Sequence, residues 1–143
     1  MPQVMLNSLA ESEQWAKDMA QTLTRPCLVL LDGELGAGKT QMVRWLVEAM
    51  GGAAATSPTF AIHQSYESPS GSIDHVDLYR LEGWSDLESA GIWDLLKQKE
   101  AMIFVEWAAR IPAEMWPKNF NLVRIHLHTV VDRPSARTLE FSV

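Results

Sequence analysis

The sequence predicts an α/β fold in which helices flank a central mixed β-sheet. Three neighbouring features carry this prediction. Residues 27–32 form an apolar run that ends in Asp32, which is typical of a buried parallel strand. A glycine-rich stretch over 33–40 follows directly, and residues 41–50 then place apolar side chains at helical spacing. A strand, a glycine-rich loop and a helix in this order predict a sheet that binds ligands at the carboxyl ends of its strands.

The first half of the chain is predicted to contain two helices. Asn7 or Ser8 can cap the first, which is expected to end near Leu23 because Pro26 cannot continue it. The second helix, over the apolar-periodic segment described above, is expected to end at Gly51-Gly52. The predicted strand and glycine-rich loop lie between these two helices.

The second half is predicted to consist mainly of strands. Residues 60–66 and 72–79 alternate in part between apolar and polar side chains and are separated by a turn at 68–71, which predicts an antiparallel hairpin. The remaining predicted elements are short helical pieces over 85–98, a buried parallel strand over 102–106, and closing strands over 122–130 and 138–143.

The length and composition predict one domain, residues 1–143. The chain has 143 residues, 47% of them apolar, and this suffices for a core without disulfides or metal ions. Its apolar runs reach only about five residues, whereas a membrane span needs about 20. Residues 1–13 carry acids where a secretory signal would carry bases and an apolar stretch. We therefore expect a cytoplasmic protein in which Cys27 is a buried core thiol.

The charge of the chain argues against direct, tight binding of nucleic acid. The formal net charge is −6, from 18 acidic and 12 basic residues. Neutralising the phosphates of a nucleic acid requires a basic surface instead. Any RNA involved in the function is therefore expected to be held by a partner protein.

Residues 33–40 read Gly-Glu-Leu-Gly-Ala-Gly-Lys-Thr and match the phosphate-binding pattern G-x-x-x-x-G-K-[ST]. Glycines let backbone N–H groups turn toward phosphate oxygens at places where a side chain would block the approach. Lys39 is expected to supply positive charge to the β- and γ-phosphates, and Thr40 a hydroxyl to Mg²⁺. The absence of a guanine-reading N-K-x-D motif favours ATP. The residues predicted to contact the nucleotide here are Gly36, Ala37, Gly38, Lys39, Thr40 and Gln41.

Glu106 is the predicted second ligand of the magnesium ion. Four apolar residues precede it in the predicted strand over 102–106, as in a Walker B strand. A Mg²⁺ site at the carboxyl edge of a sheet needs hard oxygen ligands, which Thr40, Glu106, water and phosphate oxygens would supply. The alternative is that Glu106 is an ordinary surface carboxylate at the end of its strand.

Asp77 and Thr59 are candidates for contacts near the γ-phosphate. Asp77 is predicted to orient the attacking water, and the alternative is a structural acid that pairs with Arg80. Thr59 follows Ser57-Pro58 and is predicted to contact the γ-phosphate as a switch-loop threonine does, unless this segment simply begins a strand. His75 is interpreted as a structural residue outside the chemistry.

Four motifs occur together in the chain: the loop at 33–40, Ser57-Pro58-Thr59-Phe60, the block at 75–81 and Glu106-Trp107. In this order and spacing they resemble the TsaE (formerly YjeE) family of small bacterial ATPases, from about Ser8 to the last strand. The resemblance implies a P-loop NTPase-like fold and a role in threonylcarbamoylation of adenosine 37 in tRNAs that read codons beginning with A. It also implies docking on the partner proteins TsaD and TsaB, with tRNA contacted only indirectly and the group transferred by a partner.

The same resemblance suggests roles for individual residues. It implies that Thr40 and Glu106 bind Mg²⁺ and that Trp107 lies near the nucleotide. Ser12 occupies the place in the first helix where the family usually has a threonine near the nucleotide, so Ser12 is included among the predicted nucleotide contacts. Val76 replaces a phenylalanine that is common in the family.

The predicted function is therefore a Mg²⁺-dependent ATPase with weak intrinsic activity, since no arginine finger is evident in the sequence. In this mechanism Lys39 and Asp77 are the catalytic residues. Two alternatives remain at this stage. A small-molecule kinase would share the phosphate loop but needs a lid over its acceptor, and the sequence contains no obvious arginine-rich lid segment. A non-catalytic switch would use ATP only to order an interface with a partner.

Overall fold

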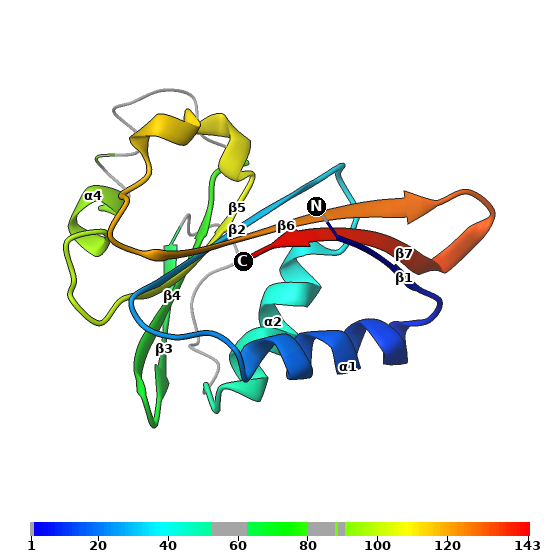
Figure 1. Cartoon of the computed structure of the whole chain (residues 1–143), viewed down its shortest axis with the longest axis horizontal. Coiled ribbons are helices and arrows are strands. Elements are labelled where there is room, and N and C mark those ends of the chain that lie inside the picture. Colours follow the sequence, from blue (N-terminus) through cyan, green and yellow to red (C-terminus); the bar gives the residue numbers. More distant parts are fainter. Residues whose placement is uncertain (1, 53–62, 80–87, 89–90) are drawn as a thin grey trace.

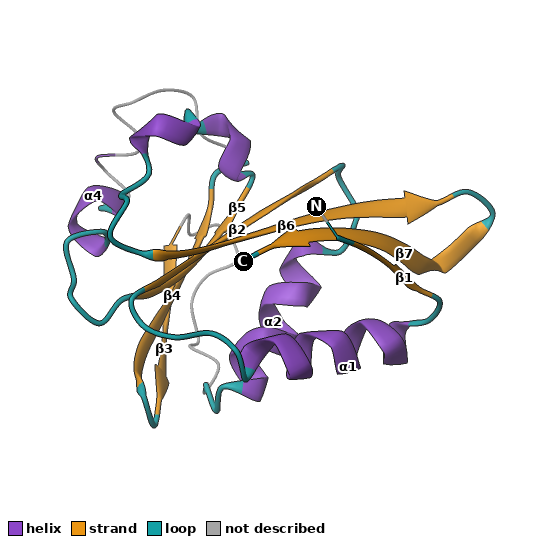
Figure 2. Cartoon of the chain, in the orientation of Figure 1, coloured by secondary structure: helices purple, strands orange, loops and turns teal. Residues whose placement is uncertain are grey.

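The computed structural model describes residues 2–52, 63–79, 88 and 91–143 (Figure 1). Within these residues, seven strands form one sheet in the order β1-β7-β6-β2-β5-β4-β3 (Figure 2). The strands are β1 (Gln3–Leu6), β2 (Cys27–Gly33), β3 (His63–Ser68), β4 (Gly71–Asp77), β5 (Met102–Glu106), β6 (Asn121–Val130) and β7 (Arg133–Ser142). The helical segments are α1 (Leu9–Ala20), α2 (Lys39–Ala49), α4 (Ile92–Leu95) and the short 3₁₀ turns η1 (Ala108–Arg110) and η2 (Ala113–Met115).

The sheet has a parallel centre and antiparallel margins. Strand β2 pairs in parallel with both β5 and β6, and β4 pairs in parallel with β5. Strands β3, β7 and β1 are joined antiparallel at the two sides. The carboxyl ends of β2, β5 and β4 consequently meet at one edge of the sheet, and the predicted mixed α/β sheet with flanking helices is confirmed.

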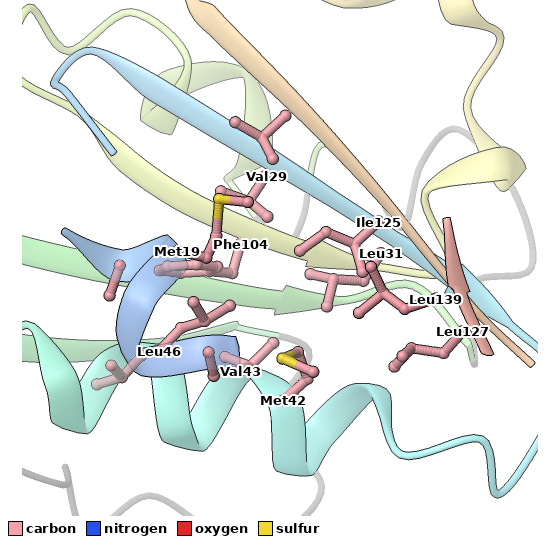
Figure 3. Packing of buried hydrophobic residues seen from close by; sticks show 14 of the residues in the cluster. Met19, Val29, Leu31, Met42, Val43, Leu46, Phe104, Ile125, Leu127 and Leu139 are labelled. Carbon is pink, nitrogen blue, oxygen red and sulfur yellow. The ribbon is translucent and has the colours of Figure 1, made fainter. Parts of the chain in front are cut away.

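Helices α1 and α2 cover one face of the sheet, and α4 lies on the opposite face (Figure 1). Figure 3 shows the first of these layers, where Leu46 of α2 and Met19 of α1 pack against Phe104 and Val29 of the sheet. The intervening strand residues, such as Ile103, face the second apolar cluster. Burial on both faces explains why the central strands read as continuous apolar runs rather than as alternating sequences.

The first two helices agree with their predicted positions to within a few residues. Ser8 caps α1, because its Oγ accepts a hydrogen bond from the Glu11 amide at 3.1 Å. The helix ends at Ala20 rather than near Leu23, since the next residues form a turn in which the Thr22 amide donates to the Met19 carbonyl. Helix α2 begins at Lys39, two positions before the predicted start.

The predicted hairpin and closing strands are also present, with corrected bounds. The β3–β4 hairpin ends at Asp77, because the Tyr79 amide turns back to donate to the Asp77 side chain. Strand β7 begins at Arg133 rather than at Thr138, and its polar first half gave no apolar signal. Strand β1 was not predicted, since it is short and gains its order from pairing with β7. Most of the predicted helical pieces before Gly91 lie outside the described residues.

Two smaller expectations can be compared directly with the structure. Cys27 is fully buried, and this burial raises the pKa of its thiol to about 11, which confirms a core cysteine. None of the helices in the described ranges is long and apolar enough to cross a membrane.

Candidate functional site

The glycine-rich segment forms a loop that leaves β2 and runs directly into α2. Gly38 is the residue before the helix and adopts φ 101°, a left-handed conformation that strains any residue with a Cβ atom. Gly33 is needed for a different reason, because a Cβ atom there would lie 2.5 Å from the Leu127 carbonyl oxygen of β6. Both glycines are therefore required by the shape of the loop, as the motif predicts.

Lys39 lies inside the loop with only 4% of its surface exposed. Its Nζ donates hydrogen bonds to the Gly33 carbonyl at 2.6 Å and to the Glu34 carbonyl at 3.0 Å, and lies 4.0 Å from the ring centre of Trp107. Burial lowers the pKa of Lys39, and the nearby acids, chiefly Glu106, oppose this shift. The ammonium group is thus held at the bottom of the loop, where a phosphate would need it.

Thr40 and Glu106 lie side by side, as expected for a pair of magnesium ligands. Thr40 Oγ1 donates to the two carboxylate oxygens of Glu106 at 2.8 and 2.9 Å. Glu106 is only 2% exposed, so the alternative reading of a surface carboxylate is wrong. Its Oε2 also lies 2.6 Å from Nε2 of His75, a buried residue of β4, which fixes the orientation of the carboxylate.

Asp77 ends β4 and pairs in register with Glu106 on β5. Its Oδ1 accepts a hydrogen bond from the Tyr79 amide at 3.0 Å. Burial raises the pKa of Asp77, the Tyr79 amide lowers it, and the neighbouring Glu106 raises it further. A carboxylate with a raised pKa is a better proton acceptor than an exposed aspartate, which suits the predicted role in orienting water.

These side chains surround a cavity of about 260 Å³ at the carboxyl edge of the sheet. The residues that line it are Leu35, Gly36, Gly38, Lys39, Thr40, Gln41, Asp77, Tyr79, Glu106 and Trp107. The structure therefore brings together eight of the predicted site residues: Gly36, Gly38, Lys39, Thr40, Gln41, Asp77, Glu106 and Trp107. The cavity joins the phosphate loop to the ends of β4 and β5.

Two predicted site residues, Ala37 and Ser12, are described by the structure but are not among those that line the cavity. Ala37 is buried within the loop, where its amide donates to the Glu34 carbonyl at 3.0 Å. Ser12 is buried in α1, and within the described part of the chain its Oγ has no hydrogen-bond partner. Its predicted contact with the nucleotide stays a prediction. Thr59 lies outside the described residues, as does Arg80, the alternative partner of Asp77.

Two residues of the site, His75 and Tyr79, fall outside the sequence prediction. His75 was assigned a structural role only, although strand alternation places it on the same face as Asp77, and that spacing was the available signal. Tyr79 also lines the cavity, and the centre of its ring lies 5.0 Å from the ring centre of Trp107. Trp107 itself adopts φ 59°, and its amide donates to the Leu31 carbonyl.

The oxygen atoms of two site residues fit a magnesium ion whose remaining ligands would come from a bound phosphate and water. In the described ranges no group of three or more His, Cys, Asp or Glu side chains could hold a metal ion by itself. The Thr40 hydroxyl and the Glu106 carboxylate are hard oxygen ligands at one point of the cavity wall. An ion held there would need its other ligands from phosphate and water, as Mg²⁺ prefers.

Replacing the partly buried acid, Asp77→Asn, is expected to stabilise the ligand-free protein near neutral pH. Because burial raises the pKa of Asp77 in the folded state, the folded chain binds more protons than the unfolded chain between the two pKa values. The wild-type free energy of unfolding should therefore fall, relative to that of the variant, as the pH rises from about 4 toward neutrality. Urea unfolding of both proteins across this pH range measures the difference.

A matched control is Asp94→Asn, because the Asp94 side chain is 89% exposed. That variant should show almost no pH-dependent difference from wild type. If Asp77→Asn behaves like Asp94→Asn, then burial does not perturb Asp77 and its assignment as a tuned proton acceptor is wrong.

Comparisons with known proteins agree with the geometry. The family model described as TsaE, Threonylcarbamoyl adenosine biosynthesis protein TsaE, matches residues 6–138. A tRNA threonylcarbamoyladenosine biosynthesis protein TsaE from Rickettsia bellii (strain RML369-C) is 36% identical over 108 residues, which cover 74% of each chain. The protein of the same name from Aquifex aeolicus (strain VF5) is 32% identical over 136 residues, 88% of this chain and 96% of its own.

A solved structure shows the same fold. The crystal structure of Bacillus subtilis YdiB superimposes with a TM-score of 0.69 and 24% identity, covering 98% of this chain and 83% of that chain. This likeness concerns the arrangement of the sheet and helices. The match to the family model, which spans most of the chain, confirms the resemblance found in the sequence motifs. The chain belongs to the TsaE family of tRNA threonylcarbamoyladenosine biosynthesis proteins.

Proposed function

We propose that this protein binds Mg²⁺-ATP in the cavity at the phosphate loop and hydrolyses it slowly, as the ATP-driven subunit of the threonylcarbamoyladenosine machinery. The observation that carries this proposal is the contact of 2.8 Å between the Thr40 hydroxyl and the buried Glu106 carboxylate, directly beside Lys39. A loop lysine, a loop hydroxyl and an acid from the neighbouring strand are the groups that P-loop ATPases use to hold a triphosphate and its cation.

The residues of the chain divide the chemistry among them. Lys39 and the loop amides would stabilise negative charge on the β- and γ-phosphates. Thr40 and Glu106 would hold the magnesium ion, which when bound neutralises charge on the phosphate oxygens. Asp77 lines the same cavity, where it would orient a water molecule for in-line attack on the γ-phosphate and accept a proton from that water.

Weak intrinsic activity is part of the proposal. Of the described residues that line the cavity, none is an arginine, and Lys39 is the only cation among them. Many enzymes that transfer phosphoryl groups need an arginine finger to stabilise charge in the transition state. A partner protein would therefore raise the rate by supplying or repositioning such a group.

The partners we propose are TsaD and TsaB, the transferase of the threonylcarbamoyl group and its dimerisation partner. The net charge of −6 gives this chain no electrostatic basis for holding tRNA alone, so the modified adenosine 37 would be presented by the partner complex. This chain would then provide ATP hydrolysis and not the transfer itself. Such a complex would act in the cytoplasm.

The experiment that tests the proposal follows the fate of the γ-phosphate. The protein is incubated with Mg²⁺-ATP alone, with the TsaD and TsaB pair, and with a panel of candidate metabolites. We expect slow release of inorganic phosphate by the protein alone and faster release with the partner pair. Stoichiometric formation of a phosphorylated metabolite would instead identify a small-molecule kinase and contradict the proposal.

A further inference from the structure

The β6–β7 hairpin holds the phosphate loop at two points. On one side, the Thr129 amide and hydroxyl both donate to Glu34 Oε1, at 2.8 and 2.6 Å. On the other side, Arg137 Nε donates to the Ala37 carbonyl at 2.7 Å. Thr129 and Arg137 are cross-strand partners in the register of β6 and β7. A single residue pair of the hairpin therefore makes the contacts with both Glu34 and Ala37. We call these four residues the loop brace.

Arg137 is itself rigidly held. Its Nη1 donates to the carbonyls of Pro134 and Ala136 at 2.8 and 2.7 Å, and its Nη2 lies 3.5 Å from the Gly36 carbonyl. All three guanidinium nitrogens are thus committed to backbone oxygens, in the fixed fork that distinguishes arginine from lysine. Arg137 is not among the described residues that line the cavity, and its contacts with the loop are to backbone carbonyls.

The position of this contact determines what it does. In a planar trans peptide the carbonyl and the next N–H point in opposite directions, so fixing the Ala37 carbonyl also fixes the direction of the Gly38 N–H. Gly38 lines the cavity and Arg137 does not, and a Cβ atom on Gly38 would be 3.8 Å from Arg137 Nε. A charge-assisted bond to the carbonyl also polarises this peptide and strengthens its N–H as a donor.

We propose that Arg137 is a positioning residue that holds the phosphate loop in its nucleotide-binding conformation before the nucleotide arrives, with Thr129 and Glu34 as the second arm of the brace. The loop contains glycines with left-handed backbone angles and would otherwise visit many conformations. Ordering it in advance removes an entropic cost from binding. This inference rests on the proposed function of the loop as a nucleotide site.

The role proposed for Arg137 differs from that of an arginine finger. An arginine finger contacts the γ-phosphate and stabilises the transition state. Its loss therefore lowers kcat and affects the binding of ATP but not that of ADP. A residue that contacts only the backbone of the loop acts on every ligand that binds to the loop amides. Its loss should raise the dissociation constants of ATP and ADP by the same factor and leave kcat at saturating ATP unchanged.

The test compares Arg137→Met with Arg133→Met in the full chain, by calorimetric titration of Mg²⁺-ATP and Mg²⁺-ADP and by steady-state kinetics. Arg133 is on the same strand and donates to the Asn7 side chain instead of the loop, so its loss is a matched change in charge. We expect Arg137→Met to lower the affinity for both nucleotides by about 10- to 100-fold and Arg133→Met to leave both affinities unchanged. Arg137→Lys should recover only part of the loss, because one ammonium replaces three placed nitrogens.

A second variant and a second readout keep the proposal testable if Arg137→Met does not fold. Thr129→Val removes one of the two hydrogen-bond donors to Glu34 and should lower the affinity for both nucleotides by about threefold. Hydrogen exchange at the amides of residues 36–39 should be faster in either variant than in wild type. Equal affinities of wild type and Thr129→Val, with unchanged exchange, would overturn the brace.

Three other outcomes are also decisive. Loss of ATP affinity and kcat in Arg137→Met with ADP affinity retained would make Arg137 a group that contacts the γ-phosphate, and would overturn the positioning role. If wild type itself binds neither nucleotide, with or without its partners, the proposed function fails before the brace is tested. Arg137→Met binding both nucleotides like wild type would refute the brace alone.

Discussion

Replacing the loop lysine, Lys39→Ala, is expected to lower the affinity for Mg²⁺-ATP by at least about 100-fold and to abolish measurable hydrolysis. The Lys39 ammonium is the only cation that lines the cavity among the described residues, and it already lies within hydrogen-bonding distance of two loop carbonyls. Its removal would take away both the charge proposed to act on the β- and γ-phosphates and the hydrogen bonds of Lys39 to the loop carbonyls. Calorimetric titration and a phosphate-release assay measure the two losses.

The matched control for this variant is Lys17→Ala. Lys17 lies on the exposed side of α1, and its ion pair with Glu13 at 3.7 Å is expected to contribute little. Lys17→Ala should therefore bind and hydrolyse ATP like wild type. Retention of wild-type ATP affinity by Lys39→Ala would mean that the loop does not hold the triphosphate.

Asp77→Asn is expected to separate binding from hydrolysis. The amide keeps the size of the side chain and an oxygen that can accept from the Tyr79 amide, but it cannot take a proton from water. We expect kcat to fall by about 100- to 1,000-fold while the dissociation constant of Mg²⁺-ATP changes by no more than about threefold. Single-turnover phosphate release and calorimetry provide the two measurements.

The same variant decides between an ATPase and a non-catalytic switch. Cells or a reconstituted system carrying Asp77→Asn as the only copy should fail to modify tRNA, whereas Asp94→Asn should support modification normally. If Asp77→Asn binds ATP like wild type, has lost hydrolysis, and still supports modification, then ATP acts only by ordering an interface and the hydrolytic role is wrong.

The central part of the fold was predictable because its signals are local. The run that became β2, the glycines of the loop and the apolar stripe of α2 each depend on neighbours in the sequence. The same holds for β5, whose bounds agree with the prediction at both ends. Strand β1 and the first half of β7 were missed, because both carry little apolar periodicity and gain their order from pairing with distant residues. Strand β1 pairs with residues 137–140 of β7, and β7 begins by pairing with β6.

The candidate site, like the fold, could be predicted only in part from the sequence. Motif spacing identified Lys39, Thr40 and Glu106, since each falls at a fixed place relative to the loop or a strand end. The supporting hydrogen bonds could not be predicted, because they join residues far apart in the chain: His75 with Glu106 is one case and Arg137 with Ala37 another. Only the register of the sheet brings such residues together.

Buried charge links the stability of this site to its function. Lys39, Glu106 and the partly buried Asp77 are all removed from water in the absence of ligand, and desolvation disfavours the charged forms of Lys39 and Asp77. In the proposed function, this cost remains until bound phosphate and cation compensate it. We therefore expect Mg²⁺-ATP to raise the free energy of unfolding of wild type and not of Lys39→Ala.

The most direct measurement is calorimetric titration of ATP into the full chain, with Mg²⁺ and then with a chelator in its place, in the absence and in the presence of the TsaD and TsaB pair. Saturable binding of ATP that is tighter with Mg²⁺ than with the chelator, and that Lys39→Ala removes, is the predicted result. No detectable binding of any purine nucleotide with Mg²⁺ and the partner pair both present would contradict a triphosphate site formed by the phosphate loop, Thr40 and Glu106.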